Sequence, residues 1–584
     1  MTTLTTRLRL SAALTTCLLA GSALADLPAA LDRAPKGAVV TIGVRNIANV
    51  QTRLETILKK FDAPVEMMMG ELSVVLDAEG FNKQGSLAFV MLGDAAKDDF
   101  DPENAVMIVP VTDFAAFAKS MGGEVKDKMA ALDNMGEGLL AKDIGGGYVA
   151  MGPEASVKAF DAPSGQLASH KTALGTSASF ADSADIVLIS NLTPLNSMLV
   201  EQFSGMKEQM GMFAAAGGGN PKMEKGMQAV QEVMEAMARD IETGAVGISM
   251  TNGGVSLDFA AQFRGDSASA KLFQSDATVG GLISSLPNIP FMFAGAMDMS
   301  NPTIRAIIKW SGEMQQMGGE QPALAGLNSM ALKTVDKVKG QAFIMGTTPA
   351  MFQTGLFANT LTYMQTSDPA GIIAAYREGI EKTNGTEVEG IKYATSYKAG
   401  AVESAGRKAD QWSMKMDVDP NSDAAMAIQQ AMMMFTGQSG ELGGYILASD
   451  KGVISTMSPN QELLTKAIEA SQGKGTLGED PGIKSVAANL PANRSFEMYL
   501  GLKGVADTAS SVMQMFAMPM PFEVADNMPP IGMAGTMTGG GVSFRTYVPM
   551  QVIDGIADAM KKLEQGEAPA DNAQPEEDRR KPRF

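Results

Sequence analysis

The sequence has little of the residue types that most catalytic and metal sites need. Its 584 residues include one cysteine, one histidine and two tryptophans. A single histidine excludes the two-histidine helix of zinc proteases and most histidine-based zinc sites. The chain also lacks a Gly-x-Ser-x-Gly nucleophile turn, a Walker loop and a glycine-rich dinucleotide loop. We therefore expect no catalytic residues, no metal site and no cofactor, and we predict that the protein is not an enzyme.

The only cysteine lies in a segment with the features of a secretory signal peptide. Arg7 and Arg9 precede an apolar stretch over residues 10–24, and Ala23 to Ala25 form a small-residue cleavage site before Asp26. We predict a signal peptide at residues 1–25 and export to the periplasm or the extracellular space. A lipoprotein signal that uses Cys17 is the alternative, but Thr16 stands where such signals need a smaller residue.

Charge and hydropathy narrow the choice of partners. The net charge is −18, which disfavours binding to nucleic acid or to an anionic membrane surface. After the signal segment, no apolar run reaches the ~18 residues that a membrane-spanning helix needs. Residues 566–584 are charged, contain proline and are poor in apolar residues, so they predict a disordered tail.

Two segments of the chain are near-copies of each other. MTNGGVSLDF occupies residues 250–259, and MTGGGVSFRT follows 287 positions later at residues 537–546. Around each glycine-rich centre, apolar residues alternate with small or polar ones, the pattern of two antiparallel strands joined by a tight turn. The central residues tolerate positive φ, as such turns require. Each copy therefore predicts a half-buried β-hairpin.

Other matches occur in the same order along the chain. Their members are 35–46 with 287–298, 88–91 with 342–345, Asp113 with Asp368, and 147–160 with 452–468. They predict two duplicated domains, at residues 26–275 and 276–565. Strand-like runs that lead into helices, together with the hairpins, favour the α+β class. We expect each domain to be a mostly antiparallel sheet with helices packed on one face.

Methionine is unusually frequent, with 45 residues. In the first domain, residues 193–242 predict a helical hairpin, because a threonine and an asparagine that can cap helices each precede a proline. Apolar residues line one side of each helix at steps of three and four, including Met223, Met227, Met234 and Met237. These stripes favour simple core packing. The alternative is a groove for apolar ligands, since methionine adapts to varied shapes.

Several weaker patterns suggest chemistry. Thioethers are ligands for Cu(I), and methionines cluster at 513–520, so copper handling is one alternative function. Ser204 and Lys207 have the Ser-x-x-Lys spacing of penicillin-recognising enzymes, without the accompanying Lys-Thr-Gly. The segment 417–423 begins like a calcium loop but lacks its glycine and glutamate. His170 lies in a polar stretch, which predicts a solvated loop histidine.

The unit formed by PKGAVVTIGVRNIANVQTRL, VPVTDFAAF, GYVAMGPEASVKAF and SADIVLISNL resembles exported bacterial proteins of an uncharacterised, domain-of-unknown-function type. The resemblance covers most of residues 35–192 and extends more thinly into the second half. It implies export and tandem α+β domains with repeated strand–helix units, and it assigns no catalytic residues.

Together these observations predict an exported, non-enzymatic binding or scaffold protein of the cell envelope. Its expected partner is a hydrophobic ligand or an envelope protein. Copper handling through methionine, or an envelope hydrolase that uses carboxylates or serine without histidine, remain as alternatives. Ligand identity and oligomeric state do not follow from the sequence.

Overall fold

A computed structural model describes residues 26–564, except 64–73, 94–103, 203, 205–220, 276–277, 318–329, 331, 349–350, 389–390, 419–424 and 516–523. The predicted signal peptide at 1–25 and the predicted tail at 566–584 lie outside these residues. Within the described part of the chain, no helix is both long enough and apolar enough to cross a membrane.

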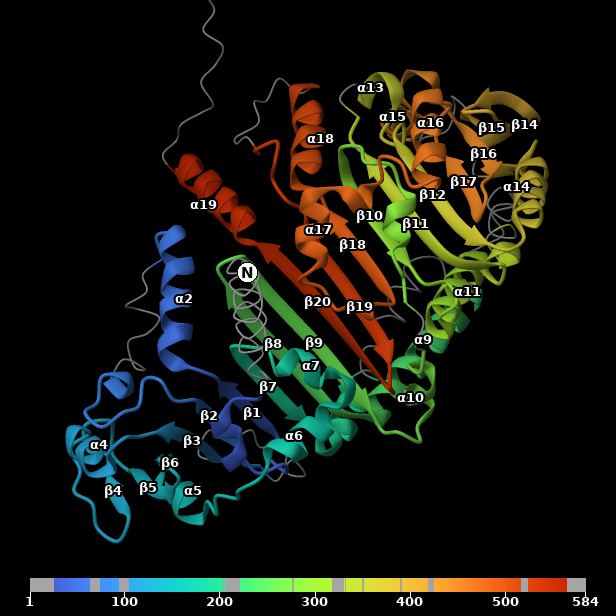
Figure 1. The fold of residues 1–584 in the computed structure, drawn as a ribbon. Helices are drawn as coiled ribbons and strands as arrows, with labels where there is room; N and C mark the ends of the chain where they lie inside the picture. The colour runs from blue at the N-terminus through green and yellow to red at the C-terminus, as the bar shows by residue number, and fades with distance from the viewer. Residues whose placement is uncertain are drawn as a thin grey trace, which may run out of the picture.

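The α+β class is confirmed, and the dominant element is one antiparallel sheet of 20 strands. The sequence predicts a sheet in each of two domains, but the strands of both segments join in a single sheet (Figure 1).

The sheet falls into two series of strands that meet at its centre. From one edge inwards, the first series is β4 (Met129–Ala131), β5 (Leu139–Gly145), β6 (Tyr148–Pro153), β3 (Ala105–Pro110), β2 (Leu87–Met91), β1 (Val40–Val44), β7 (Ile186–Asn191), β8 (Ile241–Thr251) and β9 (Gly254–Phe263).

From the centre outwards, the second series is β20 (Gly541–Pro549), β19 (Ile531–Thr538), β18 (Phe496–Leu500), β10 (Phe291–Met297), β11 (Val338–Gly346), β12 (Thr360–Thr366), β17 (Gly452–Thr456), β16 (Glu441–Ala448), β15 (Arg407–Val418), β14 (Ile391–Ser404) and β13 (Glu387–Val388).

The two series are joined by β9 and β20, the second strands of the two near-copied hairpins. Asp258 faces Arg545 in this ladder, and the two side chains form a two-pronged ion pair with N–O distances of 2.7 and 3.1 Å. The carboxylate is almost fully buried, with a side-chain exposure of 3%. A buried charge needs a partner of this geometry to offset its lost hydration. The ion pair therefore ties the halves together at the centre of the sheet.

Both predicted hairpins form, but their turns differ. Gly539 and Gly540 adopt φ of 60° and 77°, as a tight hairpin turn of mirror-image type requires. In the first hairpin, Asn252 and Gly253 form the turn without positive φ, and only Gly254 departs from the usual range, with φ of 159°. The positive-φ expectation is thus correct for the second copy and wrong for the turn pair of the first.

Short helices bury one face of the sheet, which we call the covered face; it carries Ala88, Val187, Ala245, Ala294 and Tyr499. Over the first series lie η1 (Ala29–Arg33), α6 (Leu167–Leu174) and α7 (Ala178–Ala181). Over the second lie η6 (Leu282–Ser285), α16 (Gln461–Ser471) and α17 (Pro481–Ala487). Figure 1 shows α6, α7 and α17 in front of the strands.

The structure describes eleven further α-helices. They are α2 (Ile47–Lys60), α4 (Phe114–Ser120), α5 (Glu154–Ala159), α9 (Pro221–Asp240), α10 (Ala268–Leu272), α11 (Pro302–Met317), α13 (Met351–Thr354), α14 (Pro369–Thr383), α15 (Ala425–Thr436), α18 (Leu502–Met515) and α19 (Met550–Glu564). Asp113 caps α4, which follows β3, and Asp368 caps α14, which follows β12.

Candidate functional site

The face opposite the covered face is apolar across eight central strands, β1, β7, β8, β9, β20, β19, β18 and β10. We call it the open face. Side chains alternate between faces along a strand, and paired residues share a face. The register therefore gathers Ile42, Leu188, Val246, Phe259, Phe544 and Phe496 on this side. By the same alternation, the polar side chains that these eight strands place on the open face are Ser190 and Thr546. These strands place no charged side chain on it.

Side chains on the open face remain accessible. Phe259 is 46% exposed, Phe544 is 43% exposed and Phe293 is 39% exposed. Their neighbours Ile42, Leu188 and Met498 are half-buried, whereas residues one step along the same strands, such as Val187 and Tyr499, are fully buried. Seven inter-strand spacings make the face roughly 34 Å wide. An apolar surface of this extent is typical of a binding site rather than of ordinary protein surface.

Helices enclose the open face at its margins. α4 packs Phe117 and Met121 over the outer strands of the first series, and α14 packs Ile372 over those of the second. At one end of the central strands, α10 and α11 contribute Ala270 and Ile304 to a cluster with Val542 of β20.

At the other end of the central strands, helices from the two halves meet. α19 contacts both β9 and β20. α2 is joined to α19 by a Lys60–Asp554 ion pair and by a Lys561–Asp62 pair at 3.2 Å. These ion pairs connect the two halves of the chain beside the open face.

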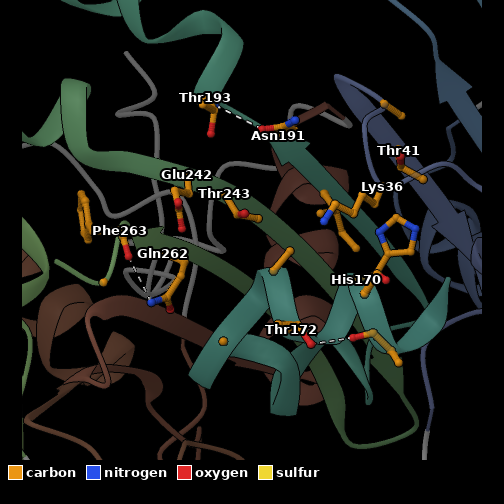
Figure 2. A pocket seen from close by; sticks show the side chains of 17 residues that line it. Lys36, Thr41, His170, Thr172, Asn191, Thr193, Glu242, Thr243, Gln262 and Phe263 are labelled. Atoms are coloured by element: carbon orange, nitrogen blue, oxygen red, sulfur yellow. Dashed lines mark hydrogen bonds between the residues drawn. The ribbon is translucent and has the colours of Figure 1, made fainter. Parts of the chain in front are cut away.

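A separate cavity of about 560 Å³ lies on the covered face, between α6 and strands β1, β7, β8 and β9 (Figure 2). Ten of the seventeen residues that line it carry polar side chains. Hydroxyl, amide and charged side chains that line it are Lys36, Thr41, Ser169, His170, Thr172, Asn191, Thr193, Glu242, Thr243 and Gln262. Thr41 lies on β1 and Thr243 lies on β8, and both are buried. The cavity therefore extends down to the strands of the sheet.

A β-bulge builds one wall of this cavity. Ile241 pairs with Phe263 and Thr243 pairs with Gln262, so β8 has one extra residue at Glu242. Such a bulge breaks the alternation and turns two consecutive side chains toward the same side of the sheet. Glu242 consequently lines the cavity beside Thr243 instead of lying on the opposite face.

His170 forms another wall, and the predicted solvated loop is wrong for this residue. It lies on α6, is 3% exposed, and its Nε2 is 3.1 Å from the carbonyl oxygen of Ala34. Burial lowers the pKa of the imidazole, an effect that the backbone hydrogen bond only partly opposes. The ring is therefore neutral at pH 7, with Nε2 as the donor to Ala34. The polar residues around His170 belong to helix α6, which buries His170 and Leu174.

The predicted methionine stripe is only partly described. α9 begins at Pro221, as expected, and residues 196–202 are helical, but 205–220, which include most of the first predicted helix, its connection and Lys207, lie outside the described residues. Met237 packs against the cluster formed by α10 and α11, whereas Met234 is 36% exposed. Nothing is described of the side chains of Met223 and Met227. The hairpin itself is thus neither confirmed nor excluded.

Other sequence candidates do not come together. Ser204 Oγ donates to Glu235 Oε1 at 3.2 Å, and the same oxygen accepts from Gln231 Nε2 at 2.6 Å, so the contact belongs to a polar cluster with α9. Within the calcium-like segment, 419–424 lies outside the described residues, as do positions 516–520 of the methionine cluster. Among the residues that the structure does describe, no group of three or more His, Cys, Asp or Glu side chains is arranged to hold a metal ion.

Comparison with known proteins does not assign the chain to a family. No protein-family model matches it, and no curated protein or solved structure is significantly similar to it. The fold and the two surfaces described above are therefore the basis for any functional proposal.

Proposed function

We propose that this protein is an exported, non-enzymatic binding protein that holds a hydrophobic ligand on the open face. The observation that carries the proposal is the uncharged, accessible apolar surface over eight strands, with Phe259 and Phe544 side by side at its centre. Apolar area removed from water contributes roughly 25 cal/mol per Å² to binding. A long aliphatic molecule lying across the strands would bury far more of this area than a compact one.

The charge of the chain and its N-terminal segment support the same proposal. A net charge of −18 disfavours anionic surfaces, so the preferred ligand is neutral or cationic in its polar part. The secretory pattern over residues 1–25 supports export to the periplasm or the extracellular space. A hydrophobic molecule cannot cross an aqueous compartment freely, and an accessible apolar face suits a carrier there. An envelope protein with an apolar segment is the alternative occupant.

We also infer that the two halves are duplicated α+β domains, as the near-copied hairpins suggest. Outward from the centre, the two series follow one plan: hairpins β8–β9 and β19–β20, then β7 and β18, then β1 and β10. The hairpin tips are held by matching bonds, Phe263 N–H to Gly540 O at 3.1 Å and Met550 N–H to Gly253 O at 2.8 Å. The donors are 287 positions apart, and so are the acceptors, the offset of the copied segments.

The relation to exported proteins of unknown function remains part of this proposal, as does the boundary near residue 275. Copper handling and a histidine-free hydrolase remain alternatives without a specific observation in their favour. Exposed methionines such as Met426 and Met433 on α15 are spread along a helix surface rather than directed at one point.

Binding of a neutral apolar dye tests the function. N-phenyl-1-naphthylamine should fluoresce on the wild-type protein, and Phe259→Ser with Phe544→Ser should weaken its binding at least tenfold, since each side chain offers one to two kcal/mol of burial. Leu272→Ser, an exposed apolar residue of α10, is the matched control and should bind as wild type. Equal dye binding by the double variant and the control, with both folded, would remove the open face as the site.

A further inference from the structure

The floor of the cavity on the covered face holds two buried hydroxyl groups without a protein partner. Thr41 is 2% exposed and Thr243 is 7% exposed, and both line the cavity. Within the described residues, neither hydroxyl forms a hydrogen bond. A hydroxyl that is removed from bulk water without a hydrogen bond costs free energy. These two groups therefore need a partner that enters the cavity.

The second series of strands shows that the fold does not require a hydroxyl at this level. Thr41 pairs with Ile189 on β7, and Ala294 pairs with Tyr499 on β18. Ile189 and Tyr499 pair in turn with hairpin positions that are 287 residues apart, so Ala294 is the counterpart of Thr41. Ala294 is fully buried without any polar group. The hydroxyl of Thr41 thus belongs to the cavity rather than to the packing of the sheet.

The register of the strands fixes the positions of the polar groups. Asn191 pairs directly with Thr243, and Thr41 lies on the other side of β7, two residues along. Asn191 Oδ1 accepts from the Thr193 N–H at 3.3 Å, which leaves the amide N–H groups for a ligand.

This arrangement also sets the size of the ligand. Figure 2 shows Thr41 and Thr243 on opposite sides of the cavity. Two inter-strand spacings and two residues along the strands put their Cα atoms roughly 12 Å apart. Two O–H···O hydrogen bonds of about 2.8 Å each take up nearly half of that distance. The remainder matches the separation of hydroxyl groups on opposite sides of one six-membered sugar ring.

The lining selects a ligand that is polar and neutral. The charged residues Lys36 and Glu242 are exposed, so a charged ligand on the floor would lose hydration without a buried partner. An apolar ligand would leave the hydroxyls unpaired. A hydroxyl group on the ligand both donates and accepts, as the threonine hydroxyls do. Ile189, directly opposite Thr41, supplies an apolar patch for the C–H face of a sugar ring.

We propose that this cavity binds a small neutral polyhydroxylated molecule of the size of a monosaccharide, with its hydroxyl groups at Thr41, Thr243 and the amide of Asn191. The volume of about 560 Å³ lies within the usual range for small-ligand sites. The cavity and the open face lie on opposite faces of the sheet, so this site is independent of the hydrophobic ligand.

Titration calorimetry on the full chain tests the proposal with four neutral probes, D-glucose, D-galactose, D-mannose and myo-inositol. At least one of them should bind saturably. The uronic acids D-glucuronate and D-galacturonate keep the ring and add a carboxylate, and they should bind at least tenfold more weakly than the best neutral probe, because the floor offers the charge no partner.

Three matched variants locate the site. Thr41→Val and Thr243→Val keep the branched shape and remove one hydroxyl, so each should weaken binding about tenfold, as expected for the loss of one buried hydrogen bond. Thr172→Val is the control, since Thr172 lines the same cavity but its hydroxyl already donates to Ala168 O at 2.8 Å. This variant should bind as wild type. Without ligand, the melting temperatures of Thr41→Val and Thr243→Val should not fall, because their hydroxyls have no protein partner to lose.

Absence of saturable heat from all four neutral probes at tens of millimolar would overturn the proposal. So would a uronic acid that binds as tightly as the neutral sugars, equal affinity of the wild type and both floor variants, or a lower melting temperature of those variants without ligand. None of these results would affect dye binding to the open face, so the two proposals fail separately.

Discussion

The two faces of the central sheet are made by the same strands, yet they differ in what covers them. On the covered face, helices after the strands pack down and side chains such as Val187 and Tyr499 lose all contact with water. On the open face, residues one position away keep apolar side chains accessible, and the described helices that pack there do so over its margins. At the centre of the sheet the covered face is thus the buried one, and we propose that the open face binds the ligand.

A pair of aromatic substitutions on one strand should show this difference most strongly. Tyr547 points to the covered face and is buried, whereas Phe544 points to the open face. Tyr547→Ser should cost about 3–5 kcal/mol of the free energy of unfolding, and Phe544→Ser less than about 1.5 kcal/mol. Urea denaturation measures both. Similar losses for the two variants would mean that the faces are not energetically distinct.

The ion pair at the centre of the sheet should give the next largest effect. Arg545→Met leaves the carboxylate of Asp258 buried without a partner, which costs about 3 kcal/mol or more. Asp258→Leu combined with Arg545→Met removes both charges and should recover most of that loss. A double-mutant cycle in urea gives the coupling energy. If the loss in free energy of unfolding of the double variant equals the sum of the losses of the two single variants, the two charges do not stabilise the junction together.

His170 predicts a pH dependence of stability. Its folded pKa is lowered by burial below the ordinary value of 6.5, so the unfolded chain binds the proton more readily. The contribution of the neutral imidazole to the free energy of unfolding is fully present above pH 6.5 and is lost as pH falls through the folded pKa. Over that range the free energy of unfolding falls with a slope that approaches about 1.4 kcal/mol per pH unit. His170→Gln should remove this part of the slope between pH 5 and 7. An unchanged slope in the variant would show that the imidazole stays accessible to protons.

The methionines of α9 should give the smallest effects. Met237→Gln places an amide in the cluster with α10 and α11 and should cost about 1–2 kcal/mol. Met234 is far more exposed, and Met234→Gln should change stability by less than about 0.5 kcal/mol. Thermal melts of the two variants compare them directly. A large loss for Met234→Gln would mean that its side chain packs more tightly than its exposure indicates.

Local features of this fold could be predicted from the sequence. The hairpins follow from alternation around glycine, and the helix starts at Asp113 and Asp368 follow from capping residues after a strand. The union of both halves in one sheet could not, because alternation does not say that β9 pairs with a strand 287 positions away. An unpaired edge on each half is equally consistent with the pattern.

The candidate sites could not be predicted from the sequence for similar reasons. Strands such as β7 are apolar at successive positions, so periodicity does not tell which face the helices will cover. In the cavity, Lys36 and Glu242 are far apart in the chain, and the bulge that redirects Glu242 has no glycine to signal it. Four consecutive polar residues, 169–172, suggested a loop at His170, although they lie within helix α6.

The ligand on the open face is the central claim, and native mass spectrometry of protein purified from its own host without detergent tests it most directly. The wild-type protein should carry a hydrophobic adduct that dissociates on collisional activation, and Phe259→Ser with Phe544→Ser should return the bare polypeptide mass with the fold intact. A wild-type protein that shows only the bare mass, or an adduct that survives in the folded double variant, would contradict the account.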